Sequence, residues 1–401
     1  MDLVLACNWD EDLVGVAKRH GVTELFGKLR QDAVGGGRVG FILPAISRRQ
    51  AARYIRRVHD AGIAFNYLLN GTCLGGRELT SRGQDDLARL LGWLHDDCGV
   101  AWFTVSIPYL AAFIKRRHPD SHVVVSMMAQ VDSVERARLW EEEGAEVLIL
   151  FDNKDFPLLK ALARHTRLRL EVPANLSCMN RCHQTFHHGN LASHASSSAG
   201  EGLYSLPLCE TRCAMLKVKE PRRILAGQWI RPQDVRLYEE IGVHRLKLLD
   251  RISPTAQLTR VVEAYANRAF SGNLAELIPG YRQDRVASYV NSGRLVTMAR
   301  AFLQPGKYNV FKALPFARRN RSPRFSIESP ALDGFLEGVM RRDCRNLSCR
   351  ECGWCEGFAN RAIRFEPGER ERFLVDSSEN LDELEGGSFF SYLPGPREGK
   401  E

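Results

Sequence analysis

The 401-residue sequence lacks several features that would place it in a familiar class. It contains no run of eighteen apolar residues, which argues against a membrane-spanning helix. Residues 1–6 combine neither a basic region nor a long apolar core, so we expect no secretory signal and predict a cytoplasmic protein. No Gly-x-Gly-x-x-Gly follows the first expected strand, which disfavours a dinucleotide-binding fold. A Gly-x-Ser-x-Gly elbow and a His-Glu-x-x-His helix are also missing, so we find no basis for proteolysis in these motifs.

Charge is unevenly distributed along the chain. The formal net charge is +8, but residues 366–401 hold ten acids and four bases, which leaves about +14 for residues 1–365. A basic body suits nucleic acid, an acidic peptide or an anionic metabolite as partner. The aromatic and basic interleaving of single-strand binders is not visible, so RNA is one of several options. We interpret the basic run 318–324 as a solvated loop and expect the acidic tail to be loosely ordered.

Cysteine, in contrast, is abundant, and eight of the eleven cysteines form two groups of four. The first group has the spacing C-x3-C, a gap of 26 residues, then C-x3-C; the second has the spacing C-x4-C-x2-C-x2-C. Clustered thiols in a reducing compartment bind metal rather than pair with one another. Four thiolates suit zinc or an iron–sulfur cluster. The first cysteine group is Cys178, Cys182, Cys209 and Cys213, and the second cysteine group is Cys344, Cys349, Cys352 and Cys355.

The remaining cysteines and the central histidines have simpler interpretations. Isolated thiols in apolar or loop surroundings are usually inert and buried, and this describes Cys7, Cys73 and Cys98. Histidine can replace a thiolate as a metal ligand. The histidines between the two halves of the first cysteine group are His183, His187, His188 and His194.

Short β-rich runs alternate with amphipathic helical stretches up to about residue 250. Such alternation predicts a parallel sheet covered by helices, and about eight units in 250 residues favour a closed (β/α)8 barrel. We therefore predict an α/β protein with a (β/α)8 barrel in residues 1–275, a small cysteine-rich extension in 276–365 and an acidic tail in 366–401. Expected helices are Ser47–Ala61, with Ser47 as N-cap, Gly83–Cys98, Ser133–Gly144 and Phe156–His165. Expected strands are Leu3–Ala6, Glu24–Gly27, Ala64–Leu69, Ala101–Val105, His122–Ser126, Val147–Phe151, Arg167–Val172, Ile224–Leu225 and Arg245–Leu248.

In a barrel of this kind, the chemistry lies where strands end and the following loops begin. Cys178 and Cys182 come directly after the seventh expected strand, which predicts that the first cysteine group lies at this mouth. The loop Gly35–Arg38 after the second strand either approaches a ligand closely or is simply flexible. The polar residues at strand ends are Asn8, Lys28, Asn66, Asn70, Ser106, Gln130, Asp152, Glu171, Asn175, Gln228, Lys247, Asp250 and Arg251.

The first cysteine group does not have the radical-SAM spacing. That signature requires a third cysteine three residues after a C-x3-C pair, because three thiolates hold three irons and leave one iron for the cofactor. Thr185 occupies this position after Cys182, and Leu216 occupies it after Cys213. A radical-SAM enzyme is therefore not expected.

Several segments together resemble the U32 "peptidase" family. Residues 229–243 read Trp-Ile-Arg-Pro-Gln-Asp-Val-Arg-Leu-Tyr-Glu-Glu-Ile-Gly-Val, and residues 245–251 read Arg-Leu-Lys-Leu-Leu-Asp-Arg. The usual family forms are Ile-Arg-Pro-Glu-Asp, Tyr-Glu-x-x-Gly and Phe-Lys-Leu-x-Gly-Arg. The resemblance extends from about residue 3 to about residue 365. Further segments similar to one branch of the family are Gly27–Leu29, Gly35–Arg38, Asn175–Cys182, Ala264–Tyr265, Gly272–Leu274 and Cys344–Cys355.

The resemblance implies a barrel that carries a [4Fe-4S] cluster on four cysteines. Family members with assigned activities resemble oxygen-independent hydroxylases of RNA bases or of a quinone precursor, with prephenate implicated as oxygen donor in the RNA branch. The peptidase label comes from a few collagenase-like members. This chain has Asp250-Arg251 where Gly-Arg is usual, and its cysteine spacing differs from the quinone-hydroxylating branch. The substrate therefore cannot be transferred from the family.

We predict an iron–sulfur-dependent redox enzyme, with oxygen-independent hydroxylation of a peptide, a small metabolite or RNA as the first hypothesis. A U32-type peptidase or a zinc-stapled binding protein is the alternative. The second cysteine group is expected to hold a second [4Fe-4S] cluster, as an electron relay or a staple, or else a structural zinc ion. A prephenate-like oxygen donor and an electron-donor protein are further expected partners. The residues expected to hold an anionic co-substrate are Arg38, Arg231, Lys247 and Arg251.

Overall fold

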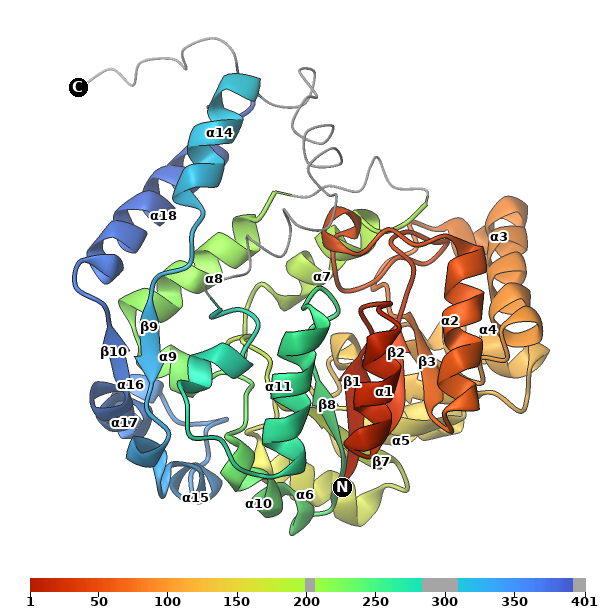
Figure 1. Ribbon diagram of the computed structural model, residues 1–401, viewed down its shortest axis with the longest axis horizontal. Helices are drawn as coiled ribbons and strands as arrows, with labels where there is room; N and C mark the ends of the chain where they lie inside the picture. The colour runs from red at the N-terminus through yellow and green to blue at the C-terminus, as the bar shows by residue number, and fades with distance from the viewer. Residues whose placement is uncertain (199–205, 283–308, 392–401) are drawn as a thin grey trace.

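Eight parallel strands close into a barrel at the centre of the computed structural model, which describes residues 1–198, 206–282 and 309–391 (Figure 1). The strands follow one another around the barrel in chain order, and β1 closes it by pairing with β8 in parallel. The predicted (β/α)8 barrel is therefore confirmed. The strands are β1 (Asp2–Ala6), β2 (Val22–Gly27), β3 (Ala64–Leu69), β4 (Trp102–Val105), β5 (His122–Val125), β6 (Ala145–Ile149), β7 (Arg169–Pro173) and β8 (Val243–Leu248).

Helices surround the barrel, and those expected from the sequence lie close to their predicted bounds. The Ser47 side chain accepts a hydrogen bond from the Gln50 backbone amide, and the Gln50 side chain accepts one from the Ser47 backbone amide. This reciprocal pair is a capping box, and it starts α2. The expected helix 83–98 is α-helical only to Gly92 and continues as a π-helical turn. The barrel helices are α1 (Asp12–Arg19), α2 (Arg48–Asp60), α3 (Ser81–Gly92), α4 (Pro108–Arg117), α5 (Val134–Glu142), α6 (Phe156–His165), α10 (Val235–Glu239) and α11 (Thr255–Ala266).

A long insertion separates β7 from α10, and its described residues include the helices α7 (Thr185–His194), α8 (Leu208–Lys219) and α9 (Arg222–Leu225). The expectation of a strand at Ile224–Leu225 is wrong, because both residues belong to α9. Both side chains are buried, and a run of two apolar residues is too short for periodicity to distinguish a buried helical turn from a strand.

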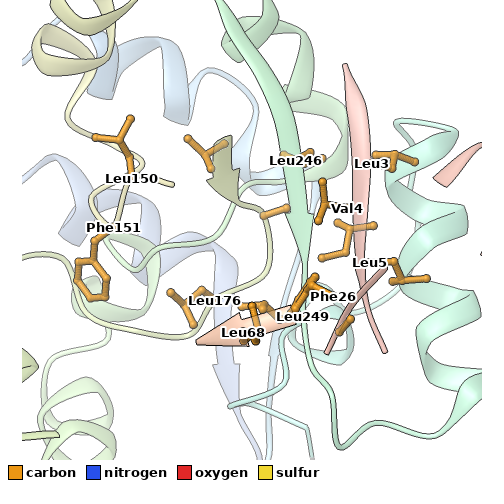
Figure 2. Close-up of a cluster of buried hydrophobic side chains, with 14 of the residues drawn as sticks. Leu3, Val4, Leu5, Phe26, Leu68, Leu150, Phe151, Leu176, Leu246 and Leu249 are labelled. Atoms are coloured by element: carbon orange, nitrogen blue, oxygen red, sulfur yellow. The ribbon is translucent and has the colours of Figure 1, made fainter. Parts of the chain in front are cut away.

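Apolar side chains of neighbouring strands pack around the barrel. Leu3, Val4 and Leu5 of β1 lie beside Leu246 of β8 in Figure 2, in agreement with the pairing of Leu3 with Leu246. Figure 2 also shows Phe26 of β2 in this cluster. These contacts bury most of the strand surface and hold the barrel closed.

A buried network of charged and polar side chains also crosses the barrel between β2, β7 and β8. Arg245 contacts Glu24 at 2.6 Å and Glu171 at 2.8 Å, and Lys247 contacts Glu171 at 2.9 Å. The amide of Asn66 donates a 3.0 Å hydrogen bond to Glu24. Each charge is partnered, as burial at low dielectric requires.

The extension after the barrel shares its core. Buried Phe335 and Phe358 belong to the same apolar cluster as Leu246 of the barrel, and β9 and β10 form an antiparallel pair. The extension therefore packs on the barrel, and the two share one continuous apolar core. Its elements are α14 (Val310–Arg319), β9 (Phe325–Ile327), α15 (Phe335–Met340), α16 (Cys349–Cys352), α17 (Trp354–Ala362), β10 (Ile363–Phe365) and α18 (Glu369–Glu385).

The acidic tail forms a packed helix, which corrects the expectation of loose order for residues 369–385. Helix α18 packs against α8 and runs beside α14 (Figure 1). Arg212 of α8 contacts Glu385 at 2.7 Å, and Arg319 of α14 contacts Glu383 at 2.8 Å. Part of the basic run thus pairs with the acidic tail instead of lying in a solvated loop. Residues 392–401 lie outside the described residues.

Within the described ranges, we find no helix with the length and apolar character needed to span a membrane.

Candidate functional site

The first cysteine group forms at the end of β7. Cys178 and Cys182 lie in the loop after this strand, whereas Cys209 and Cys213 lie one turn apart on the same face of α8. Burial, followed by the charge of Cys213, raises the pKa of Cys178 to about 12. Burial, then Glu210 and then Cys182, raises the pKa of Cys209 to about 11. Because the thiols influence one another electrostatically, all four sulfurs lie near a common centre.

The sulfurs are not packed as tightly as ligands of a single ion. Among the described residues, the only set of three or more potential ligands with all ligand atoms within 4.8 Å of one another is His95, Asp96 and His118. Neither cysteine group therefore brings three sulfurs within that distance. Four thiolates around one zinc ion would lie about 3.8 Å apart, given zinc–sulfur bonds of about 2.3 Å.

A buried lysine completes the first cysteine group, and the sequence analysis missed it. Lys217 follows Cys213 by four residues and so lies on the same face of α8. Its ammonium donates a 2.9 Å hydrogen bond to the Ser177 carbonyl and lies 5.0 Å from the centre of the Tyr281 ring. Burial lowers the pKa of Lys217, but the nearby Tyr281 and Cys213 outweigh this and raise it. The continued spacing C-x3-C-x3-K was the available signal.

Arg38 and Arg251 meet beside this group. Arg251 is 6% exposed, and its Nη1 has no hydrogen-bond partner among the described residues. Burial, with the adjacent charge of Arg38, lowers the pKa of Arg251 to about 10. Arg38 lies 3.7 Å from Asp250 and its charge lowers the pKa of both Cys178 and Arg251, so it lies near the first cysteine group as well as near Arg251. Two guanidinium groups beside one carboxylate leave a net positive charge, which favours binding of an anion at this position.

The loop that carries Arg38 is held by close packing. Gly35 has a φ of +76°, and a Cβ there would lie 2.3 Å from the carbonyl oxygen of Ser193 at the end of α7. Buried Lys28 contacts Asp32 at 2.6 Å and donates a 2.7 Å hydrogen bond to the Gly35 carbonyl. The observed role of this glycine is therefore tight packing against α7, which fixes the position of the following loop.

Arg231 does not join Arg38 and Arg251, and this corrects the sequence-based expectation. All three of its guanidinium nitrogens are engaged by the protein. It contacts Asp234 at 2.7 Å, Asp333 at 2.5 Å and the Ser329 carbonyl at 3.0 Å. Arg231 therefore clamps the barrel to the extension and is not available to hold an anion.

Lys247 is likewise occupied inside the barrel. Its ammonium contacts Glu171 and lies 3.9 Å from the centre of the Phe26 ring. These contacts place Lys247 in the buried ionic network rather than beside Arg38 and Arg251. Of the four cationic residues expected to hold a co-substrate, the geometry therefore brings together Arg38 and Arg251.

Several polar residues at the strand ends hold backbone groups. The Asn175 side chain donates to the Leu249 carbonyl at 2.7 Å, and the Gln228 side chain accepts a 2.8 Å hydrogen bond from the Asn153 amide. Asn70 differs, since it is buried and its Oδ1 has no hydrogen-bond partner among the described residues. Asn70 is therefore a further candidate for ligand contact next to the glycine loop, as Gly36 packs against it.

In the second cysteine group, Cys344 lies in the turn before α16, Cys349 and Cys352 lie on α16, and Cys355 lies on α17. Cys349 is exposed, whereas the other three cysteines are half-buried. Burial, with the charges of Cys344 and Cys349, raises the pKa of Cys355 to about 12. All four residues therefore gather at one place, as the compact spacing predicts.

This group also has a buried lysine, supplied by the barrel loop after β6. Lys154 donates a 2.6 Å hydrogen bond to the Trp229 carbonyl and a second one to the Gly227 carbonyl. Burial lowers the pKa of Lys154 to about 7, against the opposing influence of Cys355 and Asp234. The second cysteine group is thus packed directly against the carboxyl end of the barrel.

The histidines have other roles. His188 lies 3.1 Å from Glu210, and His183, His187 and His194 are exposed. The set His95, Asp96 and His118 precedes β4 and β5, so it lies at the end of the barrel opposite to the first cysteine group.

In comparisons with known proteins, no family model matches the chain. An uncharacterized protease of Methanocaldococcus jannaschii is 24% identical over 337 residues, which cover 82% of this chain and 86% of that protein. A solved U32 peptidase is 21% identical with a TM-score of 0.48, covering 62% of this chain and 93% of its own. A chitinase of Pseudoalteromonas aurantia is 8% identical with a TM-score of 0.38, and the match covers 67% of this chain and 100% of the chitinase chain.

The chain is therefore a (β/α)8-barrel protein with a cysteine-rich extension packed on the barrel. The motifs between residues 229 and 251 resemble those of the U32 peptidase family, and a solved member of that family is among the similar structures.

Proposed function

We propose that this protein is an iron–sulfur-dependent redox enzyme that modifies a biosynthetic substrate, with oxygen-independent hydroxylation as the reaction. One observation carries the proposal. The first cysteine group lies at the carboxyl end of β7, within electrostatic range of Arg38, which in turn lies beside Arg251. Active sites of (β/α)8 barrels form at this end of the strands. We also propose a reducing cytoplasmic location, where such a cluster survives.

The spacing of the sulfurs is compatible with a cluster. In a [4Fe-4S] cubane each thiolate binds a different iron, so the sulfurs lie further apart than around one ion. Among the described cysteines, no three sulfurs lie within 4.8 Å of one another, which leaves room for such a cluster. Cys178, Cys182, Cys209 and Cys213 would hold the cluster, which supplies one-electron chemistry when bound.

The protein's own residues would bind and orient an anionic co-substrate. Arg38 and Arg251 offer guanidinium donors whose geometry matches a carboxylate, and burial of Arg251 strengthens such a contact. Asn70, with its unpartnered Oδ1, would accept a hydrogen bond from a hydroxyl group of the ligand. A prephenate-like oxygen donor, as the family resemblance implies, has carboxylates that suit this pair. The modified substrate is a peptide, a small metabolite or RNA.

A peptidase is the second candidate, because the curated relative and the solved structure are named as protease and peptidase. The thiols near the barrel strands do not favour a cysteine nucleophile. Burial raises the pKa of Cys7 to about 12, and a neutral thiol is a poor nucleophile. The histidine and aspartate set at His95 lies at the opposite end of the barrel from the expected active site.

Anaerobic purification tests the proposal. We expect a brown protein with broad visible absorption and about four irons per cluster. A colourless protein that contains zinc would contradict it. Cys178→Ala should remove the iron of the first group and abolish turnover, while Cys73→Ala, a change at an isolated thiol, should alter neither. The reaction itself is read by mass spectrometry of candidate substrates after anaerobic turnover, as a gain of one oxygen atom.

A further inference from the structure

The two faces of the second cysteine group differ in exposure. Cys355 lies against buried Lys154 on the barrel side, whereas Cys349 is exposed on the outer side. Leu347, two residues before Cys349, is 48% exposed. A metal group held here would therefore have one ligand, Cys349, at the protein surface and another, Cys355, on the side of the barrel.

The segment around Cys349 is rich in arginine. Residues 341–364 contain six arginines and three acids. Arg350, next to Cys349, has a side chain that is 78% exposed and lies 3.5 Å from Glu220, whereas Arg345 contacts Asp155 at 2.8 Å. The exposed arginines of this segment are Arg341, Arg345, Arg350, Arg361 and Arg364. Such a rim around an exposed apolar side chain complements an acidic protein surface.

The aromatic residues of the same segment face inward, which disfavours single-stranded RNA as the occupant. Trp354 donates a 3.1 Å hydrogen bond to the Phe335 carbonyl, and its ring is covered by Arg342 at 3.8 Å. Phe358 is buried. Proteins that bind single strands present aromatic rings on which bases stack.

The second cysteine group also contacts the loop that carries the first. Arg181, the neighbour of Cys182, donates a 2.5 Å hydrogen bond to the Cys344 carbonyl. On a second path, Lys154 donates to the Gly227 carbonyl, and the next amide, of Gln228, donates to the Cys178 carbonyl at 2.9 Å. These hydrogen bonds link the second cysteine group and its lysine to the loop that carries Cys178 and Cys182.

We propose that residues 341–364 form the docking surface for an acidic one-electron carrier protein of the ferredoxin class, and that electrons enter the enzyme through the second cysteine group. This inference rests on the proposed function, because it requires iron–sulfur clusters at both groups. Cys344, Cys349, Cys352 and Cys355 would hold the group that accepts an electron from the carrier, and Cys178, Cys182, Cys209 and Cys213 would hold the group at the barrel mouth. The carrier's reduced centre would lose the one electron that the enzyme gains. No bond is formed or broken, and no proton is required in this step.

The test uses the anaerobically purified holoenzyme and a reduced plant-type [2Fe-2S] ferredoxin. The double variant R341E/R350E should be reduced by ferredoxin at least tenfold more slowly at low salt, since charge reversal weakens steering. Reduction by dithionite, which needs no docking surface, should be unchanged. The matched control R49E/R53E reverses two exposed arginines of α2, on the other side of the molecule in Figure 1, and should leave the ferredoxin rate unchanged.

A second variant keeps the inference falsifiable if charge reversal disturbs folding. Cys349→Ala should remove the cluster of the second group and abolish reduction of the first cluster by ferredoxin, while dithionite still reduces it. Ferredoxin reduction at the wild-type rate in either variant would overturn the inference, as would loss of RNA binding in R341E/R350E with the ferredoxin rate intact. Zinc in both groups would overturn the proposed function as well, whereas iron in both with unchanged rates would overturn only the docking surface.

Discussion

The two cysteine groups combine the same chemistry with different surroundings. Each has four thiols and one buried lysine, Lys217 in the first group and Lys154 in the second. The first is built on a barrel loop and one face of α8, next to two arginines; the second lies on short helices with one exposed cysteine. This difference suggests a division of labour, in which the enclosed group meets substrate and the exposed group meets a partner. The following predictions test that division.

The largest expected effect is the loss of metal from one cysteine group while the other group keeps its metal. Cys213→Ala should remove the iron of the first group and all turnover, whereas Cys352→Ala should leave the first group loaded and turnover with dithionite intact. The reason is that each cluster depends on its own four thiolates. Iron content per chain and the electron paramagnetic resonance signal of each reduced cluster are the measurements. Loss of both clusters in Cys352→Ala would show that the groups are not independent.

The next largest effect should be a loss of folding stability in Arg231→Ala. The change leaves Asp234, which is buried, without its partner, and breaking a buried ion pair costs about 3–5 kcal/mol. Chemical denaturation under anaerobic conditions measures this cost. Binding of a cyclic dicarboxylate by the folded variant should be unchanged, because Arg231 has no contact with Arg38 or Arg251. A large loss of dicarboxylate affinity in this variant would show that Arg231 does belong to the anion site.

Arg251→Ala should do the opposite, weakening dicarboxylate binding with less effect on folding. A charge-assisted hydrogen bond is worth about 1.5–3 kcal/mol, which corresponds to a loss of roughly 10- to 150-fold in affinity. Arg251→Lys should recover only part of this, since an ammonium lacks the guanidinium fork. Isothermal titration calorimetry gives the affinities. Equal affinity in all three proteins would exclude Arg251 from the site.

The smallest expected effect concerns the lysines. Lys217→Met removes a positive charge beside the first group and should lower the reduction potential of that cluster, because reduction adds negative charge. The matched change Lys154→Met should lower the potential of the second cluster instead. Anaerobic redox titration distinguishes the two signals. Lys217→Arg, which keeps the charge, should restore the potential, and a shift of the wrong cluster would contradict the pairing.

Local sequence patterns predicted the barrel well, because period and capping act within a few residues. The expected helix Phe156–His165 has the observed bounds, and the capping function of Ser47 is confirmed. The prediction of a strand at Ile224–Leu225 was wrong, because two apolar residues are too few to show either a helical or a strand periodicity. Helix α18 was missed because its stability depends on distant partners, among them Arg319.

The candidate site was only partly predictable for the same reason. Cysteine spacing located both groups, since ligand chemistry restricts the residues that can serve. Whether an arginine faces a ligand or an acid depends on tertiary contacts, so Arg231 could not be distinguished from Arg251 beforehand. Lys154 contacts the second cysteine group from a loop nearly 200 residues away in the sequence, which no local pattern indicates.

The clamp made by Arg231 has a consequence for protein engineering and for comparison among homologues. Because one guanidinium joins Asp234 of the barrel to Asp333 and Ser329 of the extension, the barrel cannot be shortened at residue 275 or given a foreign extension without replacing these partners together. A chain that keeps the Arg-Pro-x-Asp motif of residues 231–234 should therefore also keep an acid where Asp333 stands here. This motif, read in an unfamiliar chain, would signal that an extension is docked on the barrel.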